Sequence, residues 1–291
     1  MKKPDYVAIA KEYMRGVLDG SVPACSFVKQ AVQRQLNDLR RWGPEGGDYY
    51  FDEKEASRPC WFIENLTHTK GELAGRAIHL EPWQCFLLTT LFGWKSKAGN
   101  RRFRSAYVEV GRGNGKSTLL SGIGLFCLCA DHEPGAEVYS FATTREQAKI
   151  VFGDAQTMAR GNRALQEAYG LEVTAHALYV PATNSTFQAK SAEGSTLDGL
   201  NTHLAIIDEL HAHKKRDVFD VVETSLGKRR NSLMVSITTA GVDRTGICYE
   251  QRTLVTKILS GSLQDESYFG IIYTLDPDDD WKSDEALAKA N

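Results

Sequence analysis

The sequence predicts an α/β fold with a mostly parallel sheet flanked by helices. From residue 104 onward, short apolar runs alternate with stretches of helical periodicity, which is typical of parallel strands joined by helical crossovers. One such run, Leu204-Ala-Ile-Ile, is apolar throughout and ends in two acids, as expected of a strand buried on both faces. Residues 5–42 show helical spacing only, so we expect a helical N-terminal lobe before the sheet.

The individual elements follow from the same patterns in chain order. The segment Trp42-Gly-Pro-Glu-Gly-Gly ends the N-terminal helices, and residues 48–68 predict irregular segments and short helices. Residues 171–190 contain short β-type runs around a turn and predict a small antiparallel insertion. Strands are expected over residues 105–110, 137–142, 203–208, 233–238 and 268–274, with helices over 119–130, 144–160, 218–226 and 246–259 and another from about 283. We therefore divide the chain into a helical region 1–79, a core 80–265 and a small lid-like segment 266–291.

The core contains a phosphate-binding pattern. Val108-Glu-Val-Gly-Arg-Gly-Asn-Gly-Lys-Ser-Thr118 joins a strand end to a glycine-rich turn and an apolar helix. Backbone N–H groups of such a turn surround a phosphate chain, Lys116 supplies charge for the outer phosphates, and the Ser117 hydroxyl can hold Mg²⁺. Val110 stands where the usual Gly-x-x-x-x-Gly-Lys-Ser/Thr pattern has glycine, and a glycine turn before a capped helix would give a similar pattern. The predicted nucleotide-binding residues here are Gly111, Arg112, Gly113, Asn114, Gly115, Lys116, Ser117 and Thr118.

A second motif strengthens this interpretation. Asp208 and Glu209 end the buried strand that begins near His203. Asp208 would hold the Mg²⁺ water shell opposite Ser117, while Glu209 would orient the attacking water or take its proton. The two motifs together predict an ATP-hydrolysing P-loop NTPase of the additional-strand, catalytic-glutamate (ASCE) type, with ATP and Mg²⁺ as ligands.

Further residues are candidates for the same site. Arg112 lies four residues before Lys116, where a guanidinium could stabilise charge on the γ-phosphate, although an arginine on a glycine turn often faces solvent. Gln84 could read the N6 and N7 edge of adenine with both atoms of its amide. Thr238 and Thr239 end the strand after the one that carries Asp208, where hydroxyls can sense the γ-phosphate.

Composition limits the other function classes. The net charge of -2 gives no basic field over the whole chain, so DNA contacts must come from local runs such as 95–104 and 214–216. Arg229 or Arg230 is a candidate to enter a neighbouring subunit's site. The 6 cysteines lack zinc-ligand spacing and are expected as reduced thiols, and no apolar run has the length of a membrane span. We interpret His211-x-His213 and the acids 276–280 as ordinary polar residues.

Taken together, several motifs resemble the large terminase subunit of tailed double-stranded DNA phages. The resemblance covers residues of about 80–290, and its most specific feature is a phosphate loop with arginine four residues before lysine and no leading glycine. The motifs that carry it are Glu81-Pro-Trp-Gln84, Val110-Gly-Arg-Gly-Asn-Gly-Lys-Ser117, Ala142-Thr-Thr-Arg-Glu-Gln-Ala148, Leu204-Ala-Ile-Ile-Asp-Glu209 and Thr238-Thr-Ala-Gly241.

This resemblance implies an ATPase that pumps viral double-stranded DNA into a procapsid in the cytoplasm of an infected bacterial host. It implies a portal protein and a small terminase subunit as partners, and a homo-oligomeric ring during packaging, with an isolated domain possible as a monomer. By the same resemblance, Lys116, Arg112 and Glu209 are catalytic, Ser117 and Asp208 hold magnesium, Gln84 reads adenine, and Thr238, Thr239 and Ala240 form a coupling motif. The family's C-terminal nuclease is expected to be absent from this chain.

Two alternatives remain open at this stage. A helicase of the glutamine-motif type would use Gln84 and Asp208-Glu209 similarly, but it would need a second motor lobe that the remaining residues are too few to build. A nucleotide-gated assembly protein would bind ATP to set its oligomeric state and would turn over poorly. Turnover with and without DNA separates this last alternative from a motor.

Overall fold

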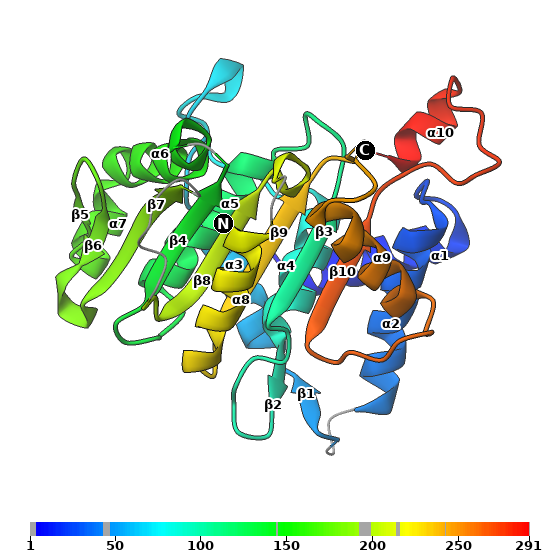
Figure 1. Ribbon diagram of the computed structural model, residues 1–291, viewed down its shortest axis with the longest axis horizontal. Helices are drawn as coiled ribbons and strands as arrows, with labels where there is room; N and C mark the ends of the chain where they lie inside the picture. The colour runs from blue at the N-terminus through cyan, green and yellow to red at the C-terminus, as the bar shows by residue number, and fades with distance from the viewer. Residues whose placement is uncertain are drawn as a thin grey trace.

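The computed structural model describes residues 4–42, 47–143, 145–191, 199–213, 216–241 and 243–290. Its centre is an 8-stranded sheet with the order β10-β3-β9-β8-β4-β7-β6-β5 (Figure 1). The strands from β10 to β7 all run parallel, and β6 and β5 continue the sheet in antiparallel orientation. The predicted α/β fold with a mostly parallel sheet is confirmed.

The strands of the sheet are short and deeply buried. All residues of β8, β9 and β10 are buried, which explains why these segments read as continuous apolar runs rather than as alternating patterns. Their bounds are β3 Ser105–Glu109, β4 Glu137–Ala142, β5 Glu172–Val173, β6 Leu178–Val180, β7 Ser185–Ser191, β8 Thr202–Asp208, β9 Leu233–Thr238 and β10 Tyr268–Ile272, with a separate antiparallel pair of β1 Tyr49–Phe51 and β2 Trp94–Ser96.

Helices cover both faces of the sheet. In Figure 1, α8 and α9 lie in front of the strands and α5 lies behind them. The α-helices are α1 Tyr6–Asp19, α2 Ser26–Arg41, α3 Glu53–Glu64, α4 Pro82–Gly93, α5 Lys116–Cys129, α6 Arg145–Gly161, α7 Arg163–Tyr169, α8 Asp217–Ser225, α9 Ile247–Leu259 and α10 Asp284–Lys289. Short 3-10 turns span Gly71–Leu73, Pro181–Thr183, Leu210–Ala212 and Leu226–Lys228.

The N-terminal helices share the core of the sheet. One continuous cluster of buried side chains runs from Tyr6 on α1 to Tyr273 just after β10, and the Tyr13 and Tyr273 hydroxyls lie 3.1 Å apart. Apolar side chains at helical spacing therefore bury α1 and α2 against the rest of the chain. The division at residues 79 and 265 stays a prediction.

Several sequence-based bounds need correction. The antiparallel unit after residue 171 is not a separate insertion, because β7 also pairs in parallel with β4 and so continues the main sheet. The segment 48–68 contains the 12-residue helix α3 and a strand rather than only short pieces. The helix predicted from residue 144 is described from Arg145, and Thr144 lies outside the described residues.

Candidate nucleotide-binding and hydrolysis site

The glycine-rich loop lies between β3 and α5, at the carboxyl edge of the sheet. Gly113 and Gly115 have φ values of 85° and 67°, which are left-handed conformations that a side chain would strain. The loop closes on itself, because Lys116 Nζ donates to the Gly111 carbonyl at 2.9 Å and Asn114 Nδ2 donates to it at 3.3 Å. Gly115 provides no side-chain cap for α5, so the first N–H groups of the helix are free to meet an anion.

The predicted loop residues differ in exposure. Lys116 is buried, Ser117 and Thr118 are half-buried, and Arg112 is exposed. Within the described part of the chain, the Arg112 guanidinium has no hydrogen-bond or ion-pair partner. Among the described residues, Arg112 is therefore an unpaired cation on the loop that precedes the N-terminus of α5.

The strand β8 delivers the two predicted acids to the same edge. Burial raises the pKa of Asp208 to about 6, and the Glu209 charge adds to this effect, while the Glu209 N–H and Lys116 oppose it. The Glu209 N–H donates to Asp208 Oδ1 at 2.9 Å. β3 and β8 lie in parallel on either side of β9, so the glycine-rich loop and Asp208 share one edge of the sheet, and Lys116 is near enough to lower the pKa of Asp208.

Glu209 has an unusual backbone. Its φ of 49° and ψ of 53° place a non-glycine residue in the left-handed region. Such conformations cost free energy and persist only where the surroundings impose them, often at functional sites. The left-handed turn ends β8 abruptly and starts the 3-10 turn Leu210–Ala212.

The predicted coupling residues lie between the two motifs. β9 pairs with both β3 and β8, and its register places Thr238 opposite Glu109, the last residue before the loop. Thr238 and Thr239 are buried and Ala240 is exposed. Thr238 Oγ1 lies 3.0 Å from Nδ1 of His211, a residue that we interpreted from sequence as an ordinary polar side chain.

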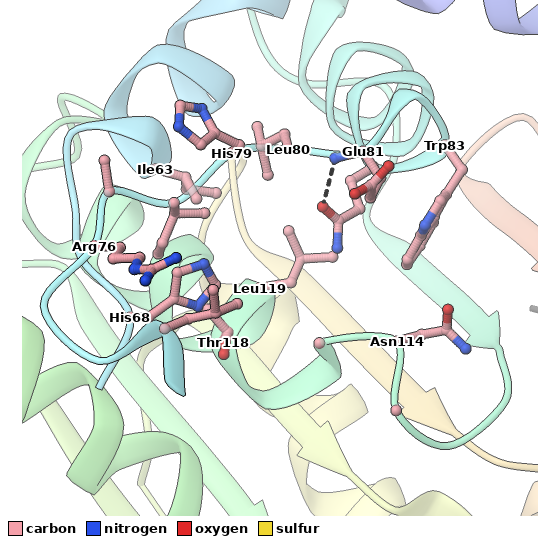
Figure 2. Close-up of a pocket in the computed structure, with 16 residues that line it drawn as sticks. Ile63, His68, Arg76, His79, Leu80, Glu81, Trp83, Asn114, Thr118 and Leu119 are labelled. Carbon is pink, nitrogen blue, oxygen red and sulfur yellow. Dashed lines mark hydrogen bonds between the residues drawn. The ribbon is translucent and has the colours of Figure 1, made fainter. Parts of the chain in front are cut away.

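A cavity of about 800 Å³ lies beside the glycine-rich loop (Figure 2). It joins the loop to the start of α4 and to the segment before that helix. Its lining includes Gly113, Asn114, Gly115, Thr118, Leu119, Trp83 and Gln84, together with His68, Arg76 and His79. Sequence reasoning missed His68, Arg76 and His79, because no local pattern marks them.

Gln84 reaches this cavity with only part of its amide free. Glu81 is the N-cap of α4, Pro82 is its first residue, and Gln84 completes a capping box. The Gln84 Oε1 accepts the Glu81 N–H at 3.0 Å, the dashed line in Figure 2. A β-carbon built on Gly115 would lie 3.7 Å from Gln84 Nε2. We predicted that both amide atoms would face adenine, but Oε1 already has one partner and Nε2 faces the loop.

Four of the five cations in the basic run 95–104 make contacts within the fold, whereas Lys97 is exposed. Lys95 pairs with Glu55, Arg101 with Asp131, and Arg102 with Asp38 and Glu266. Arg104 donates to the backbone carbonyls of Leu226 and Arg229. These cations precede or flank β3 at the amino edge of the sheet, and they form hydrogen bonds and ion pairs within the fold. In the other basic run, Arg216 is exposed and pairs with Asp220, while Lys214 and Lys215 lie outside the described residues.

Arg229 is likewise an internal residue. Its guanidinium donates to the Asn201 and Gly135 carbonyls and pairs with Glu133 at 2.9 Å. This corrects our suggestion that Arg229 could enter a neighbouring subunit's site, since its donors are already used. Arg230 is exposed and remains a candidate.

The cysteines and the terminal acids behave as ordinary residues. All 6 cysteines are free thiols. Cys127, Asp131 and His203 come within 4.8 Å of one another, but the Arg101 guanidinium occupies Asp131. Asp276 and Asp279 pair with Lys289 of α10.

No helix in the described residues is both long and apolar enough to cross a membrane.

The comparison with known families decides the identity of this arrangement. The sequence profile described as "Terminase large subunit, ATPase domain" matches residues 82–257, which is more than half of the chain. The chain belongs to the terminase large subunit family. The matched residues include the glycine-rich loop, both acids, and Thr238 and Thr239 at the end of β9.

Individual relatives show similarity over parts of the chain. The terminase large subunit of Enterobacteria phage HK97 is 32% identical over 182 residues, covering 61% of this chain and 35% of that protein. The crystal structure of the HK97 large terminase superposes with a TM-score of 0.68 and 27% identity, over 81% of this chain and 47% of that one. Protein YmfN of Escherichia coli K12 is 44% identical over 94 residues, covering 32% of this chain and 21% of that protein. The chain thus spans less than half the length of these relatives.

Proposed function

We propose that this chain is the ATP-hydrolysing motor domain of a viral DNA-packaging terminase. The observation that carries the proposal is that the glycine-rich loop after β3 and Asp208 at the end of β8 share one edge of the sheet, where Lys116 lowers the pKa of Asp208. A buried lysine beside the free N-terminus of a helix suits a phosphate chain, and adjacent acids suit a metal and a water. Family membership supports the same reaction.

In this proposal, the loop residues 111–118 bind the phosphates of ATP. The bond from Lys116 Nζ to the Gly111 carbonyl is one that a phosphate oxygen can replace, since a charged acceptor binds an ammonium more strongly than a carbonyl does. Gln84 offers Nε2 to the base from the cavity wall. Trp83 and His79 line the same cavity and extend the surface available to the nucleoside.

Mg²⁺ would be held by Ser117 and, through its water shell, by Asp208. The residues fit a hard cation, because Ser117 offers a hydroxyl oxygen and Asp208 a buried carboxylate, whose pKa burial raises and a bound cation would lower. Bound there, the ion would neutralise charge on the phosphates during phosphoryl transfer.

Glu209 and Arg112 would act on the reaction itself. Glu209 follows the metal-binding acid directly, and its left-handed backbone ends β8 at this point. We assign it the orientation and deprotonation of the attacking water. Arg112, an exposed cation of the loop, would stabilise charge on the γ-phosphate.

The motor would act on double-stranded DNA as part of a larger assembly. We propose a homo-oligomeric ring on a portal protein, with a small terminase subunit selecting the DNA, in the cytoplasm of the infected host. Thr238, Thr239 and Ala240 would couple hydrolysis to movement. That this chain lacks nuclease activity stays a prediction.

Steady-state ATP hydrolysis, with and without linear duplex DNA, tests the proposal. We expect Mg²⁺-dependent turnover that duplex DNA stimulates. ATP binding without turnover under both conditions would contradict it and favour the nucleotide-gated assembly protein. Turnover stimulated only by single strands would favour a helicase.

A further inference from the structure

His211 lies between the proposed catalytic acid and the threonines of β9. It sits in the 3-10 turn Leu210–Ala212, two positions after Glu209. Its Nδ1 lies 3.0 Å from Thr238 Oγ1 and 3.1 Å from Glu209 Oε2, and 3.4 Å from Thr239 Oγ1. One imidazole nitrogen therefore contacts both the hydrolysis motif and the predicted coupling motif.

The proton on this nitrogen follows from the bonds of Thr238. The Thr238 hydroxyl donates its only proton to the Thr239 carbonyl at 2.8 Å, so its oxygen is an acceptor toward His211. The His211 backbone N–H donates to the same oxygen at 3.1 Å. With the Thr238 proton on that carbonyl, His211 can bond the Thr238 oxygen only in the tautomer that carries the proton on Nδ1. A single Nδ1–H thus faces two acceptors, the threonine oxygen and the carboxylate.

The two acceptors are not satisfied equally. Glu209 Oε2 is buried and, among the described residues, has no aligned hydrogen bond, although it lies 3.1 Å from Nδ1. A buried carboxylate oxygen without a hydrogen bond raises the free energy of the folded state. A small rotation of the imidazole that lets Nδ1–H donate to Glu209 Oε2 is therefore favourable, if the Thr238 oxygen can lose its hydrogen bond from Nδ1. The arrangement has two discrete states. They differ in whether the Nδ1–H donates its hydrogen bond to the Thr238 oxygen or to the Glu209 carboxylate.

The surroundings hold the imidazole in place while the bond changes partner. A β-carbon on Gly241 would lie only 3.0 Å from His211 Cβ, so the segment after β9 packs closely on the histidine. The left-handed backbone of Glu209 fixes the other side of the turn. The ring can therefore exchange partners without leaving its position.

We propose that His211 is a positioning residue that links the Glu209 carboxylate to Thr238. When Glu209 turns toward a water at the γ-phosphate, the His211 Nδ1–H donates to Thr238 alone. When the phosphate departs, the Glu209 carboxylate competes with Thr238 for this hydrogen bond. The end of β9 thereby senses the state of the nucleotide. This inference rests on the proposed role of Glu209.

A path leads from Thr238 to the opposite side of the loop. Cys248 Sγ of α9 lies 3.9 Å from Thr238 Oγ1 and 3.6 Å from the Tyr107 hydroxyl. Tyr107 donates to Glu109 at 2.7 Å, directly before the glycine-rich loop. A change at Thr238 would therefore reach α9 and the strand that carries the loop.

Single-turnover hydrolysis, with protein in excess over ATP, tests the role of His211. We expect His211→Ala to slow the hydrolysis step about tenfold while the Kd for ATP changes less than about twofold. His211→Asn, whose Nδ2–H₂ lies near the position of Nδ1, should recover most of the rate. His176→Ala removes an exposed imidazole elsewhere and should match the wild type.

A double-mutant cycle tests the link to Thr238. Thr238→Val removes the hydroxyl with little change of shape, and Thr238→Ser keeps it. We expect His211→Ala and Thr238→Val together to be no slower than the slower single variant, because both break one link. Additive losses, an unchanged rate in His211→Ala, or equal losses in His211→Ala and His211→Asn would overturn the inference.

Nitrogen NMR of the imidazole provides a readout that needs no turnover. We expect the His211 Nδ1 resonance to shift when ADP with beryllium fluoride is added, and Glu209→Gln to reduce that shift. A resonance that does not respond would contradict the link. The proposed function fails separately, if Glu209→Gln hydrolyses ATP at the wild-type rate.

Discussion

Arg102 at the amino edge of the sheet and Lys116 at the carboxyl edge are both buried cations, but the fold holds them differently. Arg102 pairs with Asp38 at 2.8 Å and with Glu266 at 2.6 Å, and its guanidinium lies over the ring of Trp42 at 4.3 Å. Lys116 bonds a single loop carbonyl at 2.9 Å. The contrast teaches that cations at one edge stabilise the fold, whereas the lysine at the other keeps bonds that a ligand can replace.

The largest expected effect is the loss of folding stability when Arg102, at the amino edge of the sheet, is replaced. Arg102→Ala should lower the free energy of unfolding by about 3–5 kcal/mol, because it leaves two carboxylates without their buried partner. Urea denaturation measures this, with the exposed Arg230→Ala as the control expected within about 0.5 kcal/mol of wild type. A small loss in Arg102→Ala would remove the distinction between the two edges.

Removing the cation of the carboxyl edge should affect binding instead. Lys116→Ala should weaken ATP binding about 100-fold, since a charged contact to the phosphates is lost, while unfolding changes by less than about 1 kcal/mol. Titration with a fluorescent ATP analogue and urea denaturation of the same variant give both quantities. Equal affinity in the variant would count against the phosphate-loop assignment.

Asp208, the acid at the carboxyl edge of the sheet, should lower the free energy of unfolding at neutral pH. The pKa of Asp208 is raised from 3.8 to about 6, so above pH 6 the folded chain carries a desolvated charge that the unfolded chain carries in water. Asp208→Asn should stabilise the chain by about 2–3 kcal/mol at pH 7.5 in EDTA. The gain should shrink as pH falls from 6 toward 3.8 and vanish below about pH 3, where the wild-type carboxyl is protonated in both states. Destabilisation at pH 7.5 would contradict this account.

The smallest effect separates two adjacent arginines. Arg229→Ala should lower the free energy of unfolding by about 1–2 kcal/mol, because it frees the Glu133 carboxylate and the carbonyls of Asn201, Pro134 and Gly135. Arg230→Ala should leave the stability of the chain unchanged and, if Arg230 completes a neighbour's site, should lower only the turnover of an assembled ring. Thermal unfolding of both variants checks the first part. Equal melting temperatures would show that Arg229 is not structural.

Local patterns predicted much of the site, and long-range contacts explain what they missed. The glycine-rich loop and the acids after β8 are contiguous, so the chain order alone indicated a phosphate site. The partners of the basic run could not be predicted, because Asp131 lies 30 positions from Arg101 and Glu266 lies 164 positions from Arg102. The link from His211 to Thr238 spans 27 positions and has no sequence signature.

In the fold, too, local patterns predicted the bounds of strands, whereas long-range pairing could not be predicted. The bounds of β4 and β9 match the prediction, since buried parallel strands give uninterrupted apolar runs. The pairing of β7 with β4 was missed, because a strand's partner depends on the packing of the whole sheet and not on its own residues. We assigned the Gln84 oxygen to adenine, because its capping bond to Glu81 becomes visible only in the structure of α4.

The most direct test of the hydrolysis site compares Glu209→Gln with wild type in ATP binding and in ATP hydrolysis. The account predicts that the variant binds ATP as well as wild type does but hydrolyses it at least about 100-fold more slowly. Unchanged hydrolysis in Glu209→Gln would contradict the assignment of Glu209, and with it the proposed role of the carboxyl edge in catalysis.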